Sequence, residues 1–280
     1  MLPNNPLTQY FRQPAIYIRL PSKGRFYPPG TLTMPPNGEI PVLPMTSVDE
    51  ITYRTPDALF NGAATVNVIR SCVPSIRDPW AMPSVDVDAV LVGIRIASYG
   101  HSMPISPACP ECNEIEDVNI DLRAVNDNIS IGDYETPLRI SDLEIYLNPI
   151  TYHTMNHNNQ IQLEQQQKMN AISQGTDMDD KTKIEKLKEV MAVINDLTVK
   201  TVAFSIGAIK SPNAMVTENE FILDYLNNCD SRTFNQIRDY VIKQREVSEI
   251  KPLDLTCGHC NHKYKQAFTL DMTSFFANNS

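Results

Sequence analysis

The chain has 280 residues, of which 42% are apolar and 20% charged, a composition typical of a folded globular protein and unlike that of a disordered or fibrous one. At roughly 100 to 200 residues per domain, this length favours two lobes. The formal net charge of −9 argues against a nucleic-acid-binding protein, because such a protein needs a basic face that displaces counterions from the phosphates.

The sequence also predicts the compartment. The N-terminal stretch, MLPNNPLTQYFRQ, lacks the basic segment and the following apolar segment of a secretory signal, so we expect the protein to stay in the cytoplasm where it is made. The longest apolar run covers residues 89–94, far fewer than the roughly 20 residues of a membrane span, and no membrane role is predicted. Six cysteines are too few for a disulfide scaffold, which agrees with a reducing compartment.

Prolines dominate the beginning of the chain. Fourteen of the 21 prolines lie in residues 1–83, in runs such as YPPG and MPPNGEIPVLP. Proline fixes φ and removes a hydrogen-bond donor. Residues 1–48 are therefore predicted to form an extended arm, with short strands at residues 16–20 and 39–45.

Helices are predicted over residues 49–102. Thr55, Pro56 and Asp57 supply an N-cap, a proline at the first helical position and an acid in the first turn, and they predict a helix over residues 56–72. A second helix is predicted to begin with a cap near Ser84 and to end at Gly100.

Residues 103–148 are predicted to form β-hairpins. Two short strands flank the motif CPEC, residues 109–112, within the stretch 103–122. The stretches TPLRI and LEIYL, residues 136–140 and 143–147, are further strands, because apolar and polar residues alternate along them.

Residues 149–250 are predicted to form a helical lobe. Its first two helices, over residues 150–174 and 181–205, are expected to pack as an antiparallel hairpin, with Gly175 ending the first. Eight of the twelve residues 156–167 are amides. This amide-rich stretch indicates a solvated helix surface, with a contact to another protein as the alternative.

Two more helices are expected before the chain returns to β-structure. Thr217 and Glu220 have the spacing of a capping box. A last helix over residues 231–249 turns its apolar positions inward, namely Phe234, Ile237 and Val241. Residues 251–280 are predicted to form a second hairpin around the motif CGHC, followed by a tail that contains Phe275 and Phe276.

Four cysteines in the two Cys-x-x-Cys motifs are the strongest candidates for a functional site: Cys109, Cys112, Cys257 and Cys260. Both motifs lie in the turn of a predicted hairpin, and an asparagine follows each of them, Asn113 and Asn261. Asparagine tolerates the left-handed conformation that lets backbone amides point at a sulfur. Two such knuckles supply the four thiolates of a structural zinc site, although 144 residues separate them in the sequence.

Alternatives to a zinc site remain open at this stage. CGHC has the sequence of a redox dithiol, but a redox motif of the thioredoxin kind begins a helix, and a strand is predicted after Cys260. The four thiols could also form two pairs without metal. His259 or His262 could replace a cysteine as ligand, whereas Cys72 and Cys229 lie in helical patterns and are predicted to be buried apolar residues.

No other motif predicts a catalytic site. LPSKGR, residues 20–25, lacks the full phosphate-loop pattern and is better explained as a basic turn. His153 and His157 stand four residues apart on a predicted helix, but the glutamate of the H-E-x-x-H motif is missing, and a solvated face explains them better. The protein is therefore predicted not to be an enzyme.

These elements together predict an α+β fold. It would combine a mainly helical lobe with an extended, proline-rich N-terminal segment. The third component is a small β element like a zinc ribbon, formed by two distant hairpins. Zinc would tie the end of the chain to its middle.

Several ordered motifs resemble the baseplate hub proteins of T4-like contractile-tailed bacteriophages. They are LPSKGRFYPPG, EIPVLPMTSVDEI, RTPDALFNG, SCVP, RIASYG and CPEC in the first half of the chain, and SFF near its end. The resemblance is close over residues 16–122 and loose at the C-terminus.

This resemblance implies a structural or assembly role without enzymatic activity. The implied partners are other phage baseplate, hub and tail proteins in a symmetric assembly, and neither nucleic acid nor membrane. The implied location is the tail baseplate of the virion, after assembly in the host cytoplasm. Two hypotheses within the family stay open, a virion subunit and an assembly chaperone absent from the virion. From other classes there remain a cytoplasmic thiol oxidoreductase using Cys257 and Cys260 and, less favoured because of the acidity, a zinc-ribbon nucleic-acid binder.

Overall fold

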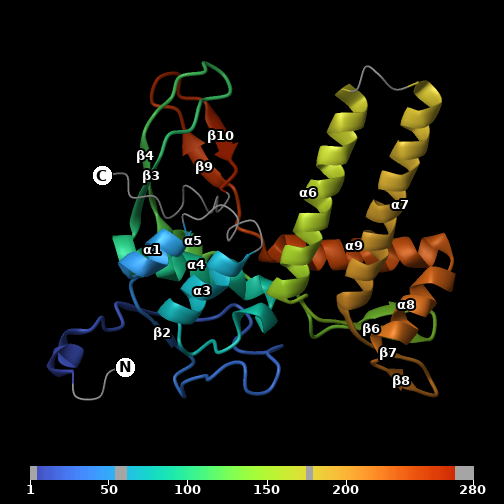
Figure 1. Cartoon of the computed structure of the whole chain (residues 1–280), viewed down its shortest axis with the longest axis horizontal. Helices are drawn as coiled ribbons and strands as arrows, with labels where there is room; N and C mark the ends of the chain where they lie inside the picture. Colours follow the sequence, from blue (N-terminus) through green and yellow to red (C-terminus); the bar gives the residue numbers. More distant parts are fainter. Residues whose placement is uncertain (1–4, 54–61, 175–178, 269–280) are drawn as a thin grey trace. The chain divides into compact units, whose positions relative to one another are not determined.

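The computed structural model describes residues 5–53, 62–174 and 179–268 (Figure 1). Contacts divide the chain into two compact units. Unit 1 takes its residues from 1–130 and 249–280, and unit 2 from 131–248. Unit 2 is thus an insertion in the sequence of unit 1, which is built from two distant segments. Among the described helices, none has the length and apolar character needed to cross a membrane.

Helix α4, Ser84–Tyr99, forms the centre of unit 1 and is buried along most of its length. Strands β1, Ile16–Ile18, and β2, Ile40–Val42, pair antiparallel and pack against it. Gly93 allows this close packing, because a Cβ at its position would lie 3.0 Å from the side chain of Ile18. The other helical elements of unit 1 are η1 (Pro6–Tyr10), α1 (Ser47–Tyr53), α3 (Ala63–Cys72), η2 (Pro79–Ala81) and α5 (Leu122–Asp127).

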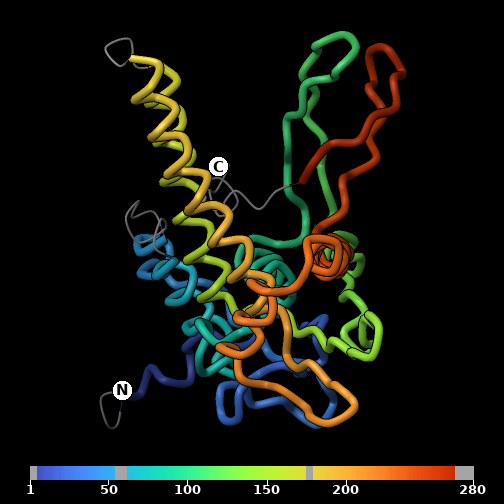
Figure 2. The backbone as a smooth tube through the Cα atoms, turned by 90° about the vertical axis from the view of Figure 1, so that its right-hand side faces the viewer, coloured from blue at the N-terminus to red at the C-terminus, as the bar shows by residue number. Residues whose placement is uncertain are grey.

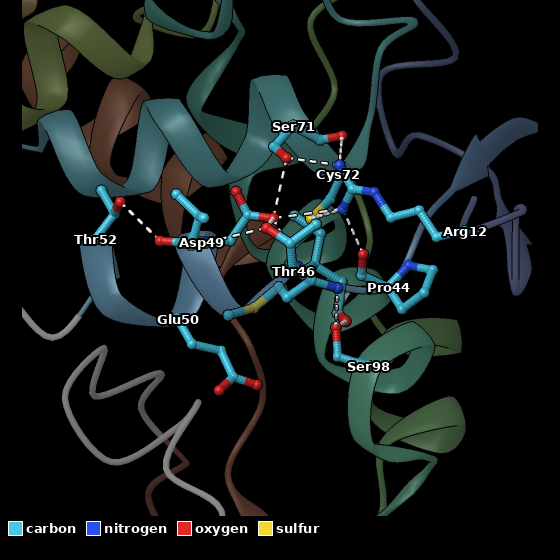
Figure 3. Close-up of polar contacts among 12 residues, drawn as sticks. Arg12, Pro44, Thr46, Asp49, Glu50, Thr52, Ser71, Cys72 and Ser98 are labelled. Carbon is cyan, nitrogen blue, oxygen red and sulfur yellow. Dashed lines mark hydrogen bonds and ion pairs between the residues drawn. The ribbon is translucent and has the colours of Figure 1, made fainter. Parts of the chain in front are cut away.

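Arg12 fastens the N-terminal segment to the body of unit 1 (Figure 3). Its guanidinium donates hydrogen bonds to the carbonyl oxygens of Pro44 and Ser71, and to Ser71 Oγ at 2.7 Å. It also lies 3.4 Å from the carboxylate of Asp49, which accepts hydrogen bonds from Thr46 and Ser71. The proline-rich arm is therefore held by a network of hydrogen bonds that reaches across 59 residues of sequence.

The basic turn at residues 20–25 is fixed by a buried carboxylate. Ser22 donates its backbone N–H to Asp86 at 2.8 Å and its hydroxyl to the other carboxylate oxygen, and neither residue is exposed. Burial raises the pKa of Asp86 to about 6. Lys23 and Gly24 follow with φ of 56° and 79°, so this segment is a tight turn, as expected from the sequence.

Two hairpins extend from unit 1 and lie side by side (Figure 2). In the first, β3 (Ser102–Ile105) pairs with β4 (Val118–Asp121), and in the second, β9 (Leu253–Thr256) pairs with β10 (Lys263–Gln266). Both pairs are antiparallel, and both turns contain a Cys-x-x-Cys motif. The predicted strands on either side of each motif are confirmed.

Unit 2 contains a four-stranded antiparallel sheet in the order β5-β6-β7-β8. Its strands are β5 (Leu138–Ile140), β6 (Leu143–Leu147), β7 (Ile206–Lys210) and β8 (Met215–Val216). Helices α8, Asn219–Asn228, and α9, Ser231–Ser248, pack with it. The fully buried side chains at the centre come from three of these elements: Ile145, Ile222 and Ile237.

The predicted antiparallel helical hairpin is confirmed in unit 2 (Figure 1). It consists of α6, Tyr152–Gln174, and α7, Asp180–Phe204. Asn158 of α6 donates its amide to Thr201 Oγ1 of α7 at 2.9 Å. In the amide-rich stretch, only Asn158 and Gln165 are buried, and most of the other amides are exposed as a solvated surface requires.

Some expectations about the elements were wrong. The segment predicted as a helical lobe also contains β7 and β8, because β7 completes the sheet that covers the core of unit 2. The capping box of Thr217 and Glu220 does not form, since α8 is preceded by Glu218 as its N-cap and has no side-chain cap. Helix α4 begins at Ser84, close to the expected start, but its N-cap residue is Pro83, which makes no side-chain cap hydrogen bond.

Some predicted features lie outside the described residues. These are the helix start at Thr55, Pro56 and Asp57, the helix stop at Gly175, and the tail residues Phe275 and Phe276. Within the described part, α3 begins at Ala63 and ends at Cys72, the predicted end of that helix. Strands β1 and β2 and helices α6, α7 and α9 lie where the sequence predicted them.

Candidate metal centre

The two knuckles have the same backbone geometry. Cys109 N–H donates to the carbonyl oxygen of Glu114, and Cys257 N–H donates to that of His262, both at 2.9 Å. Asn113 and Asn261 each donate back to the carbonyl oxygen of the first cysteine, also at 2.9 Å. The φ angles of these asparagines are 58° and 59°, so the predicted left-handed conformation is confirmed.

The knuckles bring all four predicted cysteines together, although they belong to the two separate sequence segments of unit 1. The Sγ atoms of Cys109, Cys112, Cys257 and Cys260 all lie within 4.8 Å of one another. Two of the separations run between the knuckles, with 3.7 Å from Cys109 Sγ to Cys260 Sγ and 3.7 Å from Cys112 Sγ to Cys257 Sγ. Each knuckle therefore meets the other through both of its thiols.

This arrangement fits a tetrahedral metal ion. Sulfurs at about 2.3 Å from a tetrahedral zinc lie about 3.8 Å apart, close to the observed cross-knuckle distances. A disulfide needs an S–S distance of about 2.05 Å, and all four thiols are free. Thiolate sulfur is also the donor type found in structural zinc sites, so the residues present fit the ion that the sequence predicted.

Backbone amides favour the ionised state of one thiol in particular. The N–H groups of Cys112 and Glu111 point at Cys109 Sγ and lower the pKa of this thiol to about 7. Four thiolates within 4.8 Å would repel one another strongly. A divalent cation is what would allow all of them to be ionised together.

Glu116 joins the two knuckles by a hydrogen bond. Its carboxylate accepts the backbone N–H of Gly258 at 2.8 Å, so a residue of the first hairpin holds the turn of the second. A Cβ at position 258 would lie 2.7 Å from the Glu116 carboxylate, which makes glycine the residue that permits the contact. Sequence reasoning missed this pair, because nothing in the sequence links two positions 142 residues apart.

The geometry does not support a redox dithiol. Strand β10 follows the CGHC turn, so no helix N-terminus lies at Cys260 to lower a thiol pKa. The first cysteine of each motif, which attacks in such enzymes, is buried here: Cys109 is 2% and Cys257 3% exposed. The histidines of the second knuckle, His259 and His262, are exposed and do not belong to the cysteine cluster.

The other candidate residues remain apart from this centre. His153 and His157 are exposed on α6, in agreement with a solvated face. Cys72 is fully buried, as predicted, whereas Cys229 is only half-buried at the end of α8.

Two hollows lie in unit 2, and neither adds a reactive group. The hollow beside β6, about 330 Å³, contains Arg139, Glu144 and Lys210, and both cations are paired with the glutamate, at 3.2 and 3.0 Å. The other, about 430 Å³, lies between α6 and α7 and is lined by aliphatic side chains, two lysines, Gln165 and Glu189.

Comparison with known families matches residues 36–277 to the family model described as T4 bacteriophage base plate protein. The matched segment includes both knuckles and all of unit 2, whereas Arg12 and helix η1 precede it. No curated protein and no solved structure matches the chain.

Proposed function

The chain belongs to the T4 bacteriophage base plate protein family, and on that premise we propose that it is a non-enzymatic subunit of the baseplate hub, held together by a structural zinc ion on Cys109, Cys112, Cys257 and Cys260. Family membership makes it a structural component of a phage tail baseplate. The hub assignment is supported by the ordered motifs of residues 16–122, which resemble hub proteins.

The observation that carries the zinc site is the cluster of four sulfurs. Cysteines from two motifs that are separated by 144 residues of sequence come within 4.8 Å, with cross-knuckle distances close to those around tetrahedral zinc. Bound zinc would supply no reaction at such a closed site. It would join the two chain segments of unit 1.

The role of the centre follows from the way unit 1 is built. In the sequence, the second hairpin of unit 1 follows the whole of unit 2. Each hairpin is a two-stranded ribbon with few buried side chains. Such ribbons are marginally stable alone. Metal binding contributes folding free energy directly, about 10 to 16 kcal/mol in small zinc-finger peptides, and would hold the C-terminal segment in place.

Elemental analysis tests the zinc site. The chain purified without added metal should contain about one zinc per molecule. Cys109→Ser and Cys257→Ser should each lose it, whereas Cys229→Ser, outside the cluster, should retain it. A metal-free protein that reduces disulfides would favour the thiol oxidoreductase instead.

The place in the assembly needs a separate experiment. A mass-spectrometric inventory of purified phage particles, with cross-linking to neighbouring proteins, should find the chain at a fixed ratio to other hub and tail proteins. Detection only in extracts of infected cells would support the assembly chaperone and overturn the virion subunit.

A further inference from the structure

The four thiols of the cysteine cluster differ in their access to solvent. Cys109 and Cys257, the first cysteines of the two motifs, are buried, and we call them the inner thiols. Cys260 is exposed and Cys112 is half-buried, and we call these two the outer thiols. A small molecule dissolved in water therefore meets the second cysteine of each motif first.

Each hydrogen-bonded contact between the knuckles joins an outer thiol to an inner one. Cys260 Sγ lies 3.7 Å from Cys109 Sγ. In the second contact, Cys112 Sγ lies 3.7 Å from Cys257 Sγ. Cysteines that respond to oxidants typically combine these two features, access to solvent and a second thiol poised to close a disulfide. Both contacts thus have the composition of a peroxide-sensitive pair.

We propose that hydrogen peroxide oxidises the two outer thiols and that each inner thiol then closes a disulfide with the outer thiol of the other knuckle. The two pairs are Cys109 with Cys260 and Cys112 with Cys257. This inference rests on the zinc site proposed above, because a cysteine that binds metal is deprotonated and the thiolate is the form that reacts with an oxidant. Oxidation then exchanges a metal link between the hairpins for a covalent one.

The reaction at each contact has two steps. The thiolate of Cys260 attacks one oxygen of hydrogen peroxide, the O–O bond breaks, and a sulfenic acid and a hydroxide ion form. The thiolate of Cys109 then attacks the Cys260 sulfur, the S–O bond breaks, and a second hydroxide ion leaves as the S–S bond forms. Two electrons pass from sulfur to peroxide, so each disulfide consumes one molecule of the oxidant. The same balance holds for the other pair.

Pairing across the knuckles keeps unit 1 connected when the metal is lost. A four-coordinate site needs all four thiolates, so the first disulfide is enough to release the ion. A disulfide within one motif would leave the two hairpins without a link. A disulfide between Cys109 and Cys260 joins positions 151 residues apart, and unit 2 lies between them in the sequence. The second hairpin therefore stays attached to the first with or without the ion.

Peptide mapping of the oxidised wild-type chain tests the pairing. Trypsin separates the two motifs, because one lies in the peptide of residues 96–123 and the other in that of residues 246–263. After treatment with hydrogen peroxide and alkylation of the remaining thiols, these two peptides should be recovered as a disulfide-linked pair. Disulfides confined to each peptide, or thiols that stay free in excess peroxide, overturn the proposal.

Limiting peroxide tests the roles of the outer thiols. With one molecule of hydrogen peroxide per chain, the disulfide between Cys109 and Cys260 should be the main product, because Cys260 is more exposed than Cys112. Alkylation should then label Cys112 and Cys257. The reverse distribution would overturn the assignment of Cys260 as the first site of attack.

Gel mobility gives a second measurement with a matched control. A disulfide across the knuckles closes a large ring that compacts the denatured chain, so the oxidised protein should migrate faster on a non-reducing denaturing gel. Cys109→Ser combined with Cys260→Ser leaves one cross-knuckle pair and should retain the faster band. Cys109→Ser combined with Cys112→Ser leaves the two thiols of a single motif and should lose it. Equal mobility of the reduced and oxidised wild-type chains would contradict the large ring.

Zinc analysis of the same samples distinguishes failure of this proposal from failure of the zinc site. Zinc in the reduced chain, released as the linked peptides appear, supports both. Linked peptides from a chain that never contained zinc uphold the pairing and refute the zinc site. Zinc in the reduced chain followed by disulfides within the motifs upholds the zinc site and refutes the pairing.

Discussion

Glu116→Gln is the sharpest perturbation of the candidate metal centre, because it alters the contact between the knuckles without touching a cysteine. The carboxylate accepts the Gly258 N–H at 2.8 Å, and a neutral amide oxygen would accept the same bond more weakly. Groups that orient metal ligands typically change metal affinity by about 10- to 100-fold when they are removed. Because Glu116 is exposed and glutamine retains the bond in part, we expect release of zinc to accelerate by about 10-fold, the lower end of that range.

The assay is the transfer of zinc to a chromogenic chelator, followed against time. Glu114→Gln is the matched control, since this neighbouring glutamate uses its backbone carbonyl, and not its side chain, in the knuckle. Gly258→Ala should act in the same direction as Glu116→Gln, because its Cβ would push the carboxylate away from 2.7 Å. Equal release rates for wild type and Glu116→Gln would refute the idea that this bond holds the knuckles together, even if zinc is bound at full stoichiometry.

Three further outcomes are expected. Arg12→Ala should lower the free energy of unfolding of unit 1 by about 2 to 3 kcal/mol, because a part-buried guanidinium bonded to Ser71 is lost. The midpoint of thermal unfolding should fall by roughly 5 to 10 °C. Arg12→Lys should restore only part of this stability. Burial raises the pKa of Asp86 to about 6, so the folded chain holds this proton more tightly than the unfolded chain, and stability falls as pH rises from about 4 to 6. Asp86→Asn should flatten this decline of stability with pH, measured by urea titration. Part of the decline should remain because burial also raises the pKa of Asp88 to about 6. An unaltered dependence of stability on pH would contradict the role of Asp86. Asn113→Val should weaken zinc binding because a β-branched residue resists a φ of 58°, whereas Asn113→Gly should retain it.

The candidate site could be read from the sequence to an unusual extent. Each Cys-x-x-Cys motif and the asparagine after it define a knuckle through local backbone geometry alone, and the alternation on either side defines the hairpin. Local rules suffice here because turn, strand and left-handed asparagine all depend on neighbouring residues. Helices α7 and α9 were predictable for the same reason, since apolar residues recur at helical spacing along each of them.

The polar contacts between distant positions were not predictable in this way. Arg12 with Asp49, Ser22 with Asp86 and Glu116 with Gly258 each join positions at least 37 residues apart. Strand β7 escaped prediction as well, since the five residues IGAIK, directly after a long helix, are too few to show a period of their own.

The sequence by itself determined the two knuckles, the main helices and the acidic net charge of the chain, because those depend on residue type and short-range spacing. Only the tertiary structure decided that the knuckles face each other, that Glu116 bonds one to the other, and that the apolar residues Ile184 and Met191 of α7 stay exposed. These features depend on which distant surfaces meet, and chain distance gives no measure of that: the thiols of Cys109 and Cys260 are 151 residues apart in sequence and 3.7 Å apart in space.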